Sequence, residues 1–159
     1  IMSAAVRVAH VAQAPRGWTE GLRHGAGAAN RPVTMADTNG PGLEEGWQRV
    51  REQAPTVLFV GDPTHAQTLY ELATDSGVSV PADLSIVALG EQTRRGPNAV
   101  DFTRLDAPGA ELGSRAIALL DQILNGTRGE RELPRQVLLD CTIVGGGSTL
   151  TAPNKGTGF

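Results

Sequence analysis

The stretch GVSVPADLSIVALGEQ, residues 77–92, decides which fold the chain adopts. Gly77 is placed to take the left-handed conformation that closes a helix. The apolar run from Leu84 to Leu89 is typical of a parallel strand that is covered on both faces. Because ligands of open α/β sheets sit at the carboxyl ends of the strands, Gly90 and Glu91 are candidate ligand-binding positions.

Strands and helices alternate on both sides of this stretch. Short β-branched or apolar runs predict strands at residues 6–12, 32–36, 56–60, 84–89, 100–105 and 136–144. Helical patterns fill most of the gaps, at residues 18–29, 40–53, 62–76 and about 108–124. The alternation predicts βαβ units with right-handed crossovers, and hence a doubly wound α/β domain with a mostly parallel sheet and helices on both faces.

Length and charge exclude several classes of protein. A chain of 159 residues suffices for one domain, and a formal net charge of −3 argues against nucleic-acid binding by the chain itself. No apolar run is long enough to span a membrane, and the single Cys141 excludes an internal disulfide, which fits a reducing compartment. The first residues lack the layout of a secretion signal and lead almost directly into a strand, so we expect a fragment.

Asp62 is an acid with two possible roles. It follows the strand at 56–60 and precedes Pro63, so we predict that it caps a helix, a role worth about 1 kcal/mol. The same position lies at the rim of the sheet, where a carboxylate can accept hydrogen bonds from ligand hydroxyls. The two roles are compatible and the residue types leave both open, as they leave ligand contact open for Glu91.

The sequence offers little for catalysis. No glycine-rich phosphate-binding pattern lies between a strand and a helix, and His10, His24 and His65 have no metal-ligand spacing. Cys141 lies in a predicted strand and is expected to be a small buried hydrophobe. We therefore expect no enzymatic activity, no metal and no cofactor.

From Val6 to Pro153 the chain resembles the effector-binding domain of LacI/GalR-type bacterial transcriptional regulators. The resemblance is carried, in chain order, by VRVAHVA at 6–12, APTVLFVGDPTHAQTLYEL at 54–72, GVSVPADLSIVALGE at 77–91, ELGSRAIALLDQIL at 111–124 and QVLLDCTIVGGGST at 136–149. It implies a periplasmic-binding-protein-like fold of type I, in which two subdomains close on a small molecule.

The resemblance also implies a domain organisation. It divides the chain into the second subdomain at about 5–99, a crossover strand and helix at about 100–132, and the final strand at 133–152. The first subdomain and the DNA-binding helix-turn-helix that members carry upstream have no counterpart here, so DNA would be contacted only through an absent N-terminal domain. Apolar Ile117, Leu120 and Leu124 should then be exposed and promote pairing into a homodimer.

Several positions that contact sugar in members of the family are changed in this chain. By this resemblance, the chain has lost an aspartate, an asparagine, two arginines and a glutamine. Gly90 stands in place of the aspartate, Gly61 of the asparagine, Trp18 and Gly146 of the arginines, and Ala107 of the glutamine. Asp62 is kept, and Trp18 can stack on a sugar face or an apolar ring. The candidate ligand-binding residues are therefore Trp18, Gly61, Asp62, Gly90 and Glu91, in a site whose effector is altered.

The predicted function is the ligand-sensing and dimerisation domain of a cytoplasmic LacI-type regulator, without membrane contact. A small-molecule effector, a carbohydrate or a derivative, would shift the population between closure states and so modulate DNA binding. The alternative is the solute-binding protein of a sugar transporter, which shares the fold. The VPADLSIVALG and ELGSRA segments favour the regulator.

Overall fold

The computed structural model describes residues 8–11, 16–28, 33–36, 42–90, 99–125 and 137–150. The chain divides into two compact units. The first, called the sheet unit, comprises residues 1–105 and 143–159, and the second, called the crossover unit, comprises residues 106–142.

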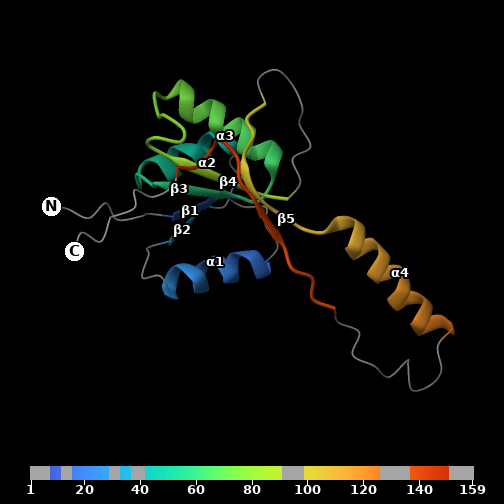
Figure 1. Ribbon diagram of the computed structural model, residues 1–159. Helices are drawn as coiled ribbons and strands as arrows, with labels where there is room; N and C mark the ends of the chain where they lie inside the picture. The colour runs from blue at the N-terminus through green and yellow to red at the C-terminus, as the bar shows by residue number, and fades with distance from the viewer. Residues whose placement is uncertain are drawn as a thin grey trace, which may run out of the picture. The chain divides into compact units, whose positions relative to one another are not determined.

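A six-stranded sheet with the order β2-β1-β3-β4-β5-β6 organises the fold (Figure 1). Its strands are β1 Val8–Val11, β2 Val33–Ala36, β3 Val57–Val60, β4 Ser85–Leu89, β5 Thr103–Asp106 and β6 Thr142–Val144. All neighbours from β2 through β5 pair in parallel, which confirms the predicted mostly parallel α/β sheet. The chain moves outward in opposite directions from β1 and β3, so the topological switch point lies between these two strands.

Four helices accompany the sheet: α1 Arg16–Ala28, α2 Gly42–Arg51, α3 Pro63–Asp75 and α4 Gly109–Asn125. Within the sheet unit, α2 and α3 lie together on one face of the sheet and α1 lies on the other (Figure 1). This is the arrangement that right-handed crossovers produce when the strand order reverses. None of the helices in the described ranges is long and apolar enough to cross a membrane.

The core lies between the sheet and the α2–α3 layer. Alternate residues of β3 and β4 are buried, and Trp47 and Val50 of α2 and Leu69 of α3 pack against them. The fully buried members of β3 and β4 are Leu58, Val60, Ile86 and Ala88. The intervening residues Val57, Phe59 and Val87 are half-buried, so the prediction that both faces are covered holds fully for one face only.

The crossover unit has a different character. No residue of α4 is buried, and Ile117, Leu120 and Leu124 are exposed, as predicted. The last strand begins only at Thr142, so the predicted strand start at Gln136 is wrong for the described residues from 137 onward. Cys141 is exposed, which also contradicts its predicted burial. The apolar residues around Cys141 could be buried only if another surface packed against them, and the sequence of this segment does not reveal whether such a surface is present.

Candidate functional site

The carboxyl ends of β3 and β4 bring two predicted site segments together. Gly61 and Asp62 follow β3, and Gly90 follows β4, with Val60 of β3 paired to Ala88 of β4. A Cβ atom built on Gly90 would lie 4.0 Å from the Cδ atom of Pro63, next to Asp62. The structure therefore gathers Gly61, Asp62 and Gly90 at one edge of the sheet, beside the switch point.

Asp62 caps α3, as predicted. Its Oδ1 atom accepts hydrogen bonds from the backbone N–H groups of Thr64, at 2.7 Å, and His65, at 3.2 Å. Pro63 occupies the first turn, where its missing N–H costs nothing. Both of these capping bonds reach the same carboxylate oxygen, Oδ1.

The hydrogen bonds of the cap keep Asp62 ionised. Burial raises the pKa of its carboxyl. That pKa is lowered by a larger total amount by the backbone N–H groups of His65 and Thr64, the Thr64 hydroxyl and the neighbouring His65 charge. The net result is a pKa below the ordinary value of 3.8. At neutral pH this edge of the sheet therefore presents a fixed negative charge.

Gly90 has a backbone that explains its residue type. Its φ of +102° lies in the region that residues with a Cβ rarely adopt, and its N–H donates to the carbonyl oxygen of Leu105 at 2.9 Å. A residue with a side chain at this position would be strained in this backbone. The predicted replacement of an aspartate by Gly90 therefore lies at a strand end whose local conformation favours glycine.

The other two predicted ligand-binding residues are Trp18 and Glu91. Trp18 is half-buried near the start of α1, the helix that follows β1, so topology assigns it to the same edge of the sheet. Glu91 lies outside the described residues. Among the described residues, no group of three or more His, Cys, Asp or Glu side chains is positioned to hold a metal ion.

Comparison with known proteins identifies the family. Residues 2–149 match the profile of the periplasmic binding protein-like domain. The chain belongs to this family. Over 77 residues it is 32% identical to the arabinose metabolism transcriptional repressor of Geobacillus stearothermophilus, a match covering 48% of this chain and 21% of that protein.

Two solved structures show the same fold as this periplasmic binding protein-like domain. A LacI family transcriptional regulator from Bifidobacterium animalis subsp. lactis has a TM-score of 0.79 and 19% identity, covering 94% of this chain and 57% of that one. The Lac repressor dimer bound to operator and the anti-inducer ONPF has a TM-score of 0.75 and 20% identity, covering 93% and 54%. The domain thus spans a little over half of these chains.

Gly146, where the resemblance predicts that an arginine has been replaced, has no room for a side chain. A Cβ atom built there would lie 2.3 Å from the backbone oxygen of Asp101 and 2.6 Å from the carbonyl carbon of Phe102. The arginine that the resemblance places at this position cannot be accommodated without moving the backbone. Ala107, the other replaced position, is half-buried in the crossover unit.

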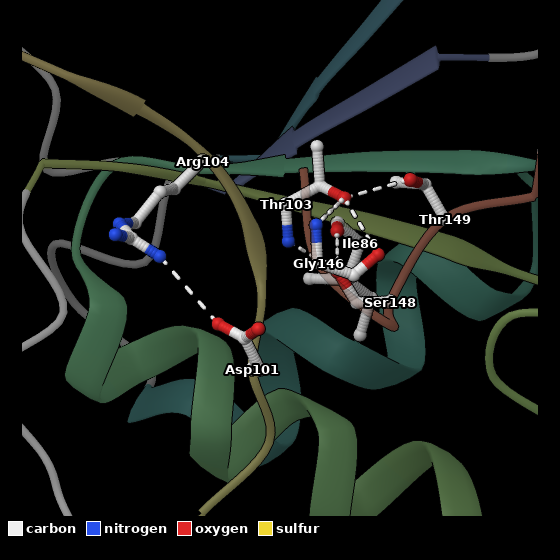
Figure 2. Close-up of polar contacts among 7 residues, drawn as sticks. All are labelled: Ile86, Asp101, Thr103, Arg104, Gly146, Ser148 and Thr149. Atoms are coloured by element: carbon white, nitrogen blue, oxygen red, sulfur yellow. Dashed lines mark hydrogen bonds and ion pairs between the residues drawn. The ribbon is translucent and has the colours of Figure 1, made fainter. Parts of the chain in front are cut away.

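Sequence reasoning missed one cluster of polar residues. Thr103 and Ser148 are linked by a hydrogen bond, and Ser148 is fully buried although it follows an exposed glycine (Figure 2). A lone serine after a glycine run carries no burial signal, so only the fold reveals it. The steric requirement for Gly146 was equally invisible in the sequence.

Proposed function

We propose that the chain is the ligand-sensing and dimerising part of a LacI-type transcriptional regulator. The observation that carries this proposal is the family match over residues 2–149, joined to a switch-point edge that presents the ionised Asp62. The named relatives are a repressor of arabinose metabolism, a LacI family regulator and the Lac repressor, which favours a regulator over a transporter component. These relatives regulate transcription, so we assign the chain no enzymatic activity.

The proposed effector is a carbohydrate or a carbohydrate derivative. The arabinose repressor supports the sugar class, and the glycines at positions 61, 90 and 146 support an effector that needs fewer polar side chains than an ordinary monosaccharide. Asp62 would accept hydrogen bonds from its hydroxyls. Trp18 would stack on its ring, and Glu91, which follows β4 in the sequence, would contribute a carboxylate.

The proposed organisation follows the resemblance. Residues 5–99 form the second subdomain, 100–132 the crossover strand and helix, and 133–152 the final strand. A first subdomain would cover the exposed apolar side chains of α4, and DNA would be bound through an N-terminal domain. The protein would act as a homodimer in the cytoplasm, as the dimeric Lac repressor on its operator supports.

Thermal unfolding with a ligand panel tests the proposal. The panel holds common hexoses, arabinose, sugar phosphates, sugar acids and glycosides. A ligand at 100 times its Kd stabilises by about 2.7 kcal/mol, so a true effector raises Tm clearly. We expect common hexoses to raise Tm little and at least one derivative to raise it strongly. A strong shift with a common hexose would contradict the altered site, and no shift with any compound would contradict the carbohydrate class.

Asp62→Asn separates ligand contact from capping, because asparagine caps helices as well as aspartate does. The variant should keep the unliganded Tm and lose most of the ligand-induced shift. Asp75→Asn, at the other end of α3, should keep both. A full ligand-induced shift in Asp62→Asn would show that Asp62 does not contact the effector.

A further inference from the structure

The chain passes between the sheet unit and the crossover unit twice, at residues 105–106 and at 142–143. The segment just before the first crossing and the segment just after the second are joined by hydrogen bonds inside the sheet unit (Figure 2). Three hydroxyls make these bonds, those of Thr103, Ser148 and Thr149, here called the hydroxyl clamp. The first belongs to β5, and the other two follow β6.

Thr103 bonds to the other segment through both its backbone and its side chain. Its backbone N–H donates to Ser148 Oγ at 2.9 Å, and the Gly146 N–H donates to Thr103 Oγ1 at 3.1 Å. Thr103 Oγ1 also lies 2.7 Å from Thr149 Oγ1 and 3.3 Å from the Gly146 carbonyl oxygen. A hydroxyl has one donor and two acceptor sites, so this oxygen can satisfy several neighbours at once.

Ser148 ties the clamp to β4. Its hydroxyl donates to the carbonyl oxygen of Ile86 at 2.6 Å, and its own carbonyl oxygen accepts from the Ile86 N–H at 2.9 Å. The side chain is fully buried, so water cannot replace these partners when the hydroxyl is removed. Ser148 therefore holds one strand on each side of it, β4 and β5.

Close backbone packing reinforces the clamp. The Gly147 N–H donates to the Asp101 carbonyl oxygen at 2.8 Å, and Gly146 lies too close to Asp101 and Phe102 to carry a side chain. On the other side, Leu105 accepts from the Gly90 N–H at 2.9 Å, so β5 stays bonded to the β4 segment up to its last residue in the sheet unit. Residues 101–105 and 146–149 thus form one body with β4.

We propose that the hydroxyl clamp is a positioning element for the crossings. It makes both connections start from a single body of the sheet unit, in which residues 101–105 and 146–149 are fixed to each other and to β4. Gly90 follows β4 and bonds to Leu105, the last residue before the first crossing. A ligand bound beside Gly90 would therefore contact the same body to which both crossings are attached. The clamp bonds are present whatever ligand the chain binds.

Amide hydrogen exchange of the 159-residue chain, followed by NMR, tests the clamp. Ser148→Ala should raise exchange at Thr103 about tenfold relative to amides in the middle of α3, because it removes the acceptor of that amide. Ser76→Ala is the matched control, since the Ser76 hydroxyl also lies in the sheet unit, is half-buried, and bonds to Trp47 and Leu72. It should leave the ratio of Thr103 to α3 exchange unchanged.

A second pair of variants keeps the test decisive if Ser148→Ala does not fold. Thr103→Val removes the hydroxyl and should raise exchange at Gly146 about tenfold, whereas Thr103→Ser should restore it. Residual dipolar couplings at 101–105 and 146–149 should fit the alignment tensor of α2 and α3 in the wild type, and fail to fit it in Thr103→Val. Equal acceleration at all amides, or couplings that still fit in the variant, would overturn the proposal.

Discussion

Removing the capping side chain of Asp62 should destabilise the sheet unit by about 1 kcal/mol. The side chain accepts two bonds, at 2.7 and 3.2 Å, from N–H groups that have no partner within the helix. Asp62→Ala should cost about 1 kcal/mol, within the range of roughly 0.5–2 kcal/mol for lost caps, and lower Tm by about 3–5 °C. Asp62→Asn should cost only a few tenths of a kcal/mol. Chemical denaturation followed by circular dichroism measures both.

The pH dependence of the Asp62→Ala effect provides a sharper test. The folded-state pKa of Asp62 lies below 3.8, so its contribution to stability is present above the ordinary pKa and is lost as pH falls through the lower folded pKa. The difference between wild type and Asp62→Ala should be full at neutral pH and shrink below about pH 4. Asp75→Ala, at the opposite end of α3, serves as the control and should not destabilise. An equal loss in both variants, or a difference that persists undiminished at low pH, would refute the capping argument.

Three further predictions follow from the packing and charge. Gly146→Ala should destabilise by about 2 kcal/mol because its Cβ would overlap the backbone oxygen of Asp101, whereas Gly145→Ala, with open space around it, should stay within about 0.5 kcal/mol in the same denaturation assay. Ile117→Glu combined with Leu120→Glu should reduce self-association in sedimentation velocity, since both side chains are exposed on α4; unchanged association would place the pairing surface elsewhere. The chain alone, with a net charge of −3, should give no sequence-selective, salt-sensitive shift of duplex DNA in gel electrophoresis, and such a shift would contradict its assignment as a sensor without a DNA-binding part.

Local sequence signals predicted the sheet unit well. The apolar run at 84–89 became β4, Gly77 took a φ of +78°, and Asp62 capped the helix that Pro63 begins. Each of these features depends on residues adjacent in the chain, such as a glycine that tolerates positive φ or a carboxylate next to free N–H groups. Such signals can be read without knowing the rest of the fold.

Features that depend on distant segments could not be predicted. The burial of Cys141 and the strand start at Gln136 were expected from apolar character, but Cys141 and the neighbouring Leu138 are exposed. The requirement for Gly146 comes from the backbone of Asp101, which is 45 residues away in sequence. For the site, the sequence analysis identified Gly61, Asp62 and Gly90, whereas only the strand register showed that they lie at one edge.

The most direct test of the regulator assignment is to read the coding sequence immediately upstream of Ile1. We expect a first subdomain preceded by a helix-turn-helix, about 200 residues in total for domains of ordinary size. A secretion signal in that position would instead place the protein outside the cytoplasm. That result would contradict the regulator assignment and make solute transport the working hypothesis.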